Sequence, residues 1–120
     1  MSTLMLTYLL MMLMQIFHIF EEIGMGAYKV AHSLNKYLFA ASVLVTINFS
    51  AFALIAFNMR FGLFLGLLTS GVLALGNGVV HVFGVIKTKT FRDSLGAGVF
   101  TGIPLAIVGL IVFIQLIQNI

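Results

Sequence analysis

Long apolar stretches alternate with short polar breaks along the chain. A helix needs roughly 20 apolar residues to cross a bilayer core, and each stretch reaches that length. The pattern therefore predicts an all-α, polytopic membrane protein, a bundle of four transmembrane helices that forms one membrane domain over residues 1–120. The first stretch has no basic region and no small-residue cleavage site, so we expect a retained span and not a signal peptide. The expected spans are approximately residues 4–23, 38–58, 61–86 and 96–117.

The polar breaks carry the basic residues of the chain. We expect residues 24–37 to form a short interfacial segment after the first span, and a tight turn at Arg60 to join the second span to the third. Loops one and three lie on one side of a four-span bundle. Because basic residues mark cytoplasmic loops, we expect these two loops in the cytoplasm and both termini outside, in a bacterial-type plasma membrane. The basic residues of loops one and three are Lys29, Lys36, Lys87, Lys89 and Arg92.

Composition supports a membrane protein and excludes several other classes. Hydrophobic residues make up 62% of the chain, and the mean hydropathy is +1.20. A soluble chain of this length cannot hide so much apolar surface from water. The chain has no cysteine, which excludes disulfides and thiolate metal sites. The net charge of +3 comes from the orienting loops, so we expect the lipid bilayer as a partner and no nucleic acid. The sequence is also compatible with a homo-oligomer.

Small residues recur every four positions in the third and fourth spans. Helices in lipid associate through close backbone contact along such stripes, so we expect these two spans to pack tightly. A path for the tail of a lipid-like substrate is the alternative. We expect the three tyrosines, Tyr8, Tyr28 and Tyr37, to lie at the membrane interfaces. The stripes are Gly62, Gly66, Ser70, Ala74 and Gly78, then Ser94, Gly98, Gly102 and Ala106.

The sequence His18-Ile-Phe-Glu21-Glu22 concentrates ionisable groups at the end of the first span. A charged group at mid-membrane costs about 2.5–3.5 kcal/mol on insertion scales, so such groups usually have a function. At about 100° per residue, Glu21 lies to one side of His18 and Glu22 to the other. This arrangement suits a metal ligand with a supporting acid, or a general acid–base pair. The alternative is a pair of interfacial acids beside loop lysines, with the histidine capping the helix end.

Asn77 and His81 form a second polar pair on one face of the third span. The inferred topology brings His81 and His18 to the same depth, near the cytoplasmic face. Two histidines and one carboxylate, here His18, His81 and Glu22, are a suitable set for a single divalent metal, zinc or iron. Asn77 would support this site, unless the pair only links helices by hydrogen bonds. Asn48, in the second span, is a second supporting polar candidate or a helix contact.

The two polar elements resemble those of the HXXEE family of small integral membrane proteins. The motif reads His18-Ile-Phe-Glu21-Glu22, and an Asn-x-x-x-His element follows as Asn77 to His81. The family's Tyr-x-Pro-Gly element is replaced here by residues 91–98, which lack the proline. The resemblance covers residues 18 to about 110 and implies a candidate active site without specifying a reaction.

We expect an enzyme that acts on a lipid or isoprenoid-like substrate at the cytoplasmic leaflet. His18, His81 and one glutamate, Glu22, would bind the metal, and the other glutamate, Glu21, would act as acid or base. A metal-free variant would use Glu21, Glu22 and His18 for proton transfer to an alkene. Two other classes stay open: a proton- or cation-coupled transporter that works as a homo-oligomer, and a non-catalytic subunit that binds lipid or protein.

Overall fold

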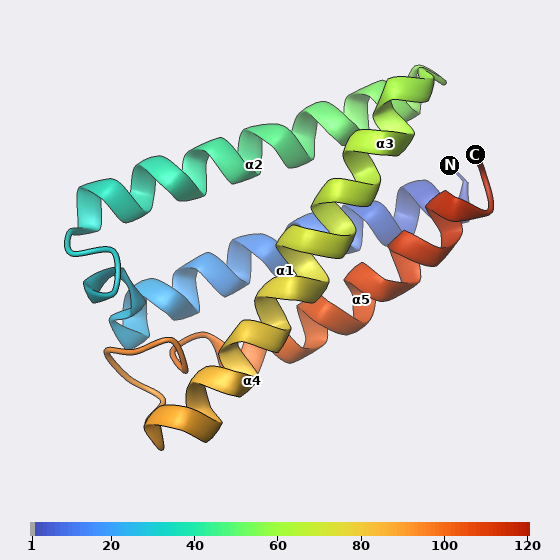
Figure 1. Ribbon diagram of the computed structural model, residues 1–120. Coiled ribbons are helices and arrows are strands. Elements are labelled where there is room, and N and C mark those ends of the chain that lie inside the picture. Colours follow the sequence, from blue (N-terminus) through green and yellow to red (C-terminus); the bar gives the residue numbers. More distant parts are fainter. Residues whose placement is uncertain (1) are drawn as a thin grey trace.

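Four long helices joined by short loops make up the computed structural model, which describes residues 2–120 (Figure 1). This part of the chain contains no strand, so the all-α prediction is confirmed. All four helices are long and apolar enough to cross a membrane. Their bounds lie within a few residues of the predicted spans: α1 Thr3–Met25, α2 Leu34–Ala56, the continuous helix Arg60–Thr88, and α5 Val99–Ile117.

The first loop is shorter than predicted because a serine caps the helix that follows it. The Ser33 hydroxyl accepts a hydrogen bond from the Lys36 backbone N–H, which satisfies one of the free donors at the start of α2. Helix α2 therefore begins at Leu34, and Tyr37 lies in its first turn. The remaining loop contains the single 3₁₀ turn η1, Ala27–Lys29.

The third long helix contains a π-helical stretch that the sequence pattern did not predict. Its three parts are α3 Arg60–Leu68, η2 Thr69–Gly76 and α4 Asn77–Thr88. Thr69 and Ser70 are the first two residues of this stretch, and their hydroxyls both donate to the Gly66 carbonyl in α3. Such bonds compete with the regular backbone ladder. The π-helical turns end immediately before Asn77, and stretches of this kind are frequent next to functional sites.

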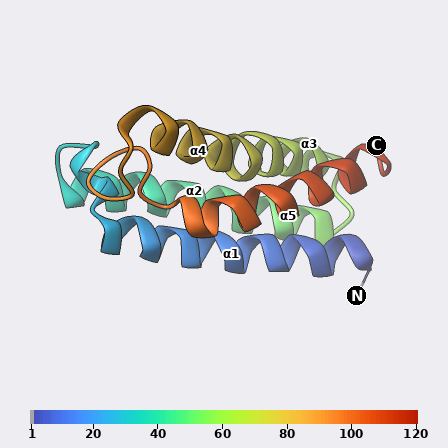
Figure 2. The ribbon, with the colours of Figure 1, turned by 90° about the horizontal axis from the view of Figure 1, so that it is seen from below.

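Both termini lie at one end of the bundle, and loops one and three lie at the other (Figures 1 and 2). The two loops touch each other: the Asp93 N–H donates to the Met25 carbonyl at 2.8 Å, and Lys29 Nζ lies 2.7 Å from Asp93 Oδ1. Hydrogen bonding and attraction to the Asp93 carboxylate raise the pKa of Lys29. The prediction that loops one and three share a side is therefore confirmed.

Helix α2 packs mainly against α3 and also contacts α1. Near its C-terminal end it lies against α3 beside the turn at Arg60, and it diverges from α4 towards the loop end of the bundle (Figure 1). Helix α5 lies between α1 and the η2–α4 part of the third helix (Figure 2). Helices α2 and α4 therefore make no contact with each other, and a cavity lies between them in the loop half of the bundle.

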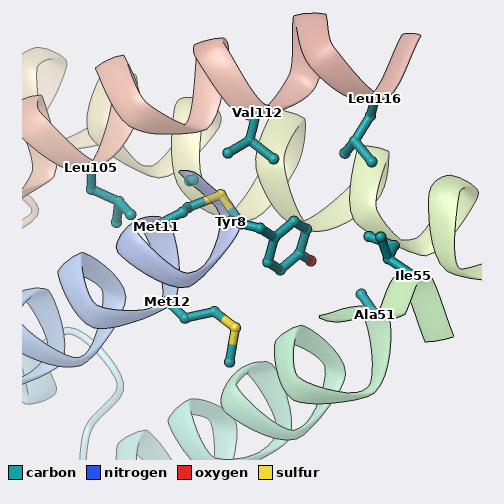
Figure 3. Packing of buried hydrophobic residues seen from close by; sticks show 9 residues of the cluster. Tyr8, Met11, Met12, Ala51, Ile55, Leu105, Val112 and Leu116 are labelled. Atoms are coloured by element: carbon teal, nitrogen blue, oxygen red, sulfur yellow. The ribbon is translucent and has the colours of Figure 1, made fainter. Parts of the chain in front are cut away.

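The apolar core lies towards the end of the bundle that carries the termini (Figure 1). The side chains labelled in Figure 3 come from α1, α2 and α5 and point towards one another. Tyr8 is fully buried there, and its hydroxyl lies 2.5 Å from Thr69 Oγ1. The prediction that Tyr8 lies at an interface is wrong, because the Tyr8 hydroxyl finds a hydrogen-bond partner inside the core, the Thr69 hydroxyl. Most large apolar side chains, such as Leu13, Phe20 and Phe64, point outwards. The core residues are Tyr8, Met11, Met12, Ala51, Ile55, Ala74, Leu105, Val112 and Leu116.

The small-residue stripes produce the predicted close contact between the third and fourth spans. A Cβ added at Gly78 would lie 2.4 Å from the Gly102 carbonyl oxygen, and one added at Gly109 would lie 2.6 Å from Ala74 Cβ. Gly62, at the start of the same stripe, instead meets α2, where an added Cβ would lie 2.6 Å from the Ile55 backbone nitrogen. Tight helix packing thus accounts for most of the stripe.

Candidate metal centre

Three ionisable side chains meet in the loop half of the bundle. His18 and Glu22 lie one turn apart on α1, and His81 reaches them from α4. The two Nε2 atoms of the histidines are 3.1 Å apart, and Glu22 Oε1 lies 3.2 Å from His81 Nε2 and 3.7 Å from His18 Nε2. His18 is fully buried and His81 almost fully. Within residues 2–120, these three side chains form the group that could hold a metal ion.

The spacing of the three ligand atoms suits tetrahedral coordination. Three ligands about 2.1 Å from a tetrahedral zinc ion lie about 3.4 Å from one another. The distances of 3.1, 3.2 and 3.7 Å are close to this value. A metal ion therefore fits among His18, Glu22 and His81 once the Asn77 amide, whose Nδ2 lies 2.8 Å from His18 Nε2, turns away from that atom, and a fourth position stays open for water or substrate.

The hydrogen bond of His81 on its outer side fixes the direction of its lone pair. His81 Nδ1 lies 2.7 Å from the carbonyl oxygen of Leu95, in the loop before α5. A carbonyl can only accept, so Nδ1 carries the proton and donates it. The other nitrogen, Nε2, then presents a lone pair to the site, as expected for a histidine that binds a metal.

His18 is oriented in the same way by a chain of two hydrogen bonds. Thr101 in the first turn of α5 donates its hydroxyl proton to Glu21 Oε2, and its Oγ1 lies 3.0 Å from His18 Nδ1. Because the single hydroxyl proton of Thr101 is used for Glu21, the hydroxyl can only accept from His18. His18 Nδ1 is therefore protonated, and its Nε2 also points a lone pair at the site.

Glu21 does not join the cluster, because its carboxylate caps another helix. It accepts hydrogen bonds from the backbone N–H groups of Phe100 and Thr101, at 3.1 and 2.7 Å. These donors belong to the first turn of α5, which has no side-chain cap of its own at Gly98. An anion at this place satisfies free donors and interacts favourably with the helix dipole. The structure thus places Glu21 as a helix cap that also orients His18 through Thr101.

Glu22 is held by residues from two other helices. Its Oε2 accepts a hydrogen bond of 2.5 Å from the Tyr37 hydroxyl, at the start of α2. Its Oε1 faces the two histidines. Tyr37 was expected at an interface, and the early start of α2 brings it to the site instead.

The two predicted supporting asparagines lie in different places. Asn77 Nδ2 donates to His18 Nε2 at 2.8 Å, so the structure brings Asn77 to the cluster. Asn48 does not reach it: it lines a small void between α1 and α2 together with Gln15. The buried oxygens Asn48 Oδ1 and Gln15 Oε1 have no hydrogen-bond partner.

Gly98, the N-cap residue of α5, and Gly102, within α5, provide the space for the imidazole rings. A Cβ added at Gly98, where φ is +101°, would lie 2.8 Å from Glu22 Cγ and 2.9 Å from His18 Cε1. One added at Gly102 would lie 3.3 Å from His18 Cε1 and 3.4 Å from His81 Cδ2. The stripe of the fourth span, predicted for helix packing, therefore also shapes the site.

A cavity of about 400 Å³ reaches the cluster from the open side of the bundle. It lies among α1, α2 and the η2–α4 region, where α2 diverges from α4. Glu22, Tyr37 and Asn77 form its polar end, and the rest of its wall is mostly apolar. Ligand sites commonly have this size and this combination of an apolar wall with a few polar groups.

Residues 2–120 thus form an all-helical protein with four helices that could cross a membrane and a buried His–His–Glu group that could hold a metal ion. The chain belongs to the family described as "Protein of unknown function with HXXEE motif", whose model matches residues 9–109. The resemblance inferred from the motif is therefore confirmed. No curated protein and no solved structure matches the chain.

Proposed function

We propose that the protein is a metal-dependent membrane enzyme that acts on a lipid or isoprenoid-like substrate. A single divalent ion, zinc or iron, would bind to His18, Glu22 and His81. At a fourth position it would activate water or polarise a substrate oxygen. Glu21 and Thr101 would keep His18 in its metal-binding tautomer.

One observation carries this proposal: three lone-pair donors face one another in a buried place. In each histidine the proton of the neutral ring is on Nδ1, which bonds to a partner outside the cluster. The atoms that face one another, His18 Nε2, His81 Nε2 and Glu22 Oε1, therefore carry lone pairs and no proton. Burying such a group is costly unless a cation lies among its members. A divalent metal ion supplies that cation and matches the spacing of the ligands.

The arrangement of apolar and charged residues supports a place in the membrane. The four long helices expose large apolar side chains on their outer surface, while polar residues such as His18, His81 and Thr69 are buried. This distribution is the one expected for a bundle in lipid. In the proposed orientation, loops one and three face the cytoplasm of a bacterial-type cell and the termini face outwards, since Arg60 is the only basic residue outside the loop end.

The cavity between α2 and α4 supports the choice of substrate class. Its apolar wall, which includes Leu44, Val72 and Val80, suits a hydrocarbon chain that enters sideways from the bilayer. Its polar end at Glu22 and Asn77 would receive the reacting part of the substrate. An apolar chain of the lipid would thus lie along α2 with its polar group beside the metal.

Metal-free acid–base catalysis is the second candidate, and a specific hydrogen bond favours it. Asn77 Nδ2 donates to His18 Nε2, which occupies the lone pair that a metal would need. A proton shared by His81 Nε2 and Glu22 Oε1, 3.2 Å apart, would then supply the positive charge. Such a pair can give a proton to a lipid-soluble substrate and take one back.

Coupled transport receives less support from the core. The polar groups in the half of the bundle that carries the termini are uncharged, and several are paired with each other, such as the buried Tyr8 and Thr69 and the half-buried Thr7 and Gln115. In the part of the chain that the structure describes, this half of the core holds no carboxylate or imidazole side chain that could pass a proton across the bundle.

The test of the enzyme proposal is a comparison of membrane lipids in cells that contain the protein or its His81→Ala variant. We expect at least one lipid species that changes in abundance with the active protein and not with the variant. The matched control is His32→Ala, which alters an exposed loop histidine and should behave like the parent protein. Indistinguishable lipid profiles in all three strains, with equal protein levels, would contradict the proposal.

A further inference from the structure

A second hollow reaches the cluster from the loop end of the bundle. It has a volume of about 230 Å³ and lies between loop one and loop three. Ala27, Val30 and Ala31 form its wall on one side, and Ser94 and Leu95 form it on the other. We call this space the loop-side hollow, and we call the 400 Å³ space between α2 and α4 the bilayer-side cavity.

The two spaces approach the site from different directions and meet at one pair of residues. Glu22 and Tyr37 line both of them. His81 lines only the loop-side hollow, and Asn77 lines only the bilayer-side cavity. The hydrogen bond of 2.5 Å between the Tyr37 hydroxyl and Glu22 Oε2 therefore lies at the boundary between them.

The surroundings of the two spaces differ in polarity. The loop-side hollow is framed by the segments that carry Lys29 and Asp93, whose ion pair joins the two loops. The bilayer-side cavity lies between helices that expose large apolar side chains, such as Phe39 and Val43 on α2. Apolar side chains predominate in both walls, so the difference lies in what surrounds each space: we expect water to reach the first from the polar loops and hydrocarbon chains to reach the second from the apolar helix surfaces.

We propose that the site has two separate entrances and that the Tyr37–Glu22 pair is the partition between them. Water, as the second reactant or the carrier of protons, enters by the loop-side hollow and reaches Glu22 and His81. The lipid-soluble substrate enters by the bilayer-side cavity, and this half of the proposal rests on the proposed function. Tyr37 is a positioning residue: it holds Glu22 at the boundary and keeps the bilayer-side cavity dry.

This arrangement solves a problem that any reaction between a lipid and water must meet. The hydrocarbon part of the substrate has to stay out of water, while the reacting group has to receive it. Two entrances that meet at Glu22 allow both, because water need not cross the apolar cavity.

The chain has no cysteine, so single cysteines can report the accessibility of each space without background. The variants are Ala31→Cys in the loop-side hollow and Leu44→Cys in the bilayer-side cavity, in protein embedded in lipid nanodiscs. Each is treated with a charged methanethiosulfonate and, separately, with a lipophilic maleimide. We expect the charged reagent to label Ala31→Cys at least about tenfold faster than Leu44→Cys, since the reactive thiolate and the charged reagent are both disfavoured in an apolar cavity. The lipophilic reagent should label both.

Removal of the Tyr37 side chain should change the rate at which the charged reagent labels Leu44→Cys and leave the rate for Ala31→Cys unchanged. Adding Tyr37→Ala to Leu44→Cys should raise its labelling by the charged reagent towards the rate of Ala31→Cys. Tyr37→Phe, which keeps the ring and the packing, should give a smaller rise. Tyr28→Ala, a tyrosine that lines neither space, is the control and should have no effect.

Two outcomes would overturn the proposal. Slow labelling of Ala31→Cys by the charged reagent would show that water does not enter by the loop-side hollow. Equal labelling of Leu44→Cys with and without the Tyr37→Ala substitution would show that Tyr37 does not separate the two spaces. Neither readout depends on a bound metal or on turnover, so failure of the enzyme proposal leaves this test intact and can be recognised separately.

Discussion

The adjacent carboxylates of Glu21 and Glu22 point to different sides of α1 and bind different partners. Glu21 accepts hydrogen bonds from the first backbone N–H groups of α5, while Glu22 faces the two histidines and the Tyr37 hydroxyl. The pair therefore combines a helix cap with a candidate metal ligand. This division of roles distinguishes the effects expected from the two substitutions.

Glu21→Gln should mainly lower stability, whereas Glu22→Gln should mainly lower metal content. Loss of the charged cap should lower the free energy of unfolding by about 1 kcal/mol and leave metal bound. Glu22→Gln should remove the metal and leave α5 capped. Thermal unfolding and metal analysis of the two variants give both quantities. Equal metal loss in both variants would contradict this division of roles.

Thr101→Val should weaken metal binding although Thr101 touches no metal. The substitution keeps the shape of the side chain but removes the acceptor of the His18 Nδ1 proton and the donor to Glu21. Loss of such an outer hydrogen bond typically lowers metal affinity about 10- to 100-fold. Metal titration measures the change, and Thr101→Ser, which restores the hydroxyl, should recover most of it. An unchanged affinity in Thr101→Val would argue against the orienting role.

Gly98→Ala should disrupt the site, while Gly24→Ala should be tolerated. Gly98 has a φ of +101°, and an added Cβ would lie 2.8 Å from Glu22 Cγ. The backbone strain alone costs about 1–3 kcal/mol. Gly24 lies in α1 with nothing within 4 Å of an added Cβ, so alanine there should slightly stabilise the helix. Thermal unfolding of the two variants provides the comparison, and equal stability would contradict the close packing at Gly98.

The double substitution Gln15→Leu and Asn48→Leu should leave metal binding unchanged. The buried oxygens of these two side chains have no hydrogen-bond partner, and an unsatisfied buried group costs about 1–3 kcal/mol. Replacing both by apolar groups should therefore keep or raise the free energy of unfolding. A drop in metal affinity would instead restore Asn48 to the supporting role that the sequence suggested.

Much of this molecule follows from its sequence because the signals are local. Four apolar stretches predicted four helices, and the spacing of His18, Glu21 and Glu22 predicted that the two acids point to different sides of α1. Convergence of His81 with His18 followed from the depth of each residue in its span. Each of these inferences needs only the helical period and the order of the spans.

The outer partners of the site could not be predicted, because they depend on packing between distant segments. The Leu95 carbonyl and Thr101 carried no signal that separates them from other loop and helix residues. The sequence pattern predicts Tyr37 at an interface because hydropathy does not reveal the Ser33 cap, which starts α2 at Leu34. The π-helical stretch at Thr69–Gly76 leaves the apolar pattern of the span intact, so periodicity did not reveal it.

Metal analysis of the purified protein tests the proposed centre most directly, since the chain has three histidines and only two lie in the cluster. The parent protein and His32→Ala should each bind one zinc or iron ion per chain, whereas His18→Ala and His81→Ala should bind none. Folding of each variant is checked by its helical circular dichroism. A parent protein that binds no divalent ion after loading, or a His81→Ala variant that binds as much as the parent, would contradict the metal centre.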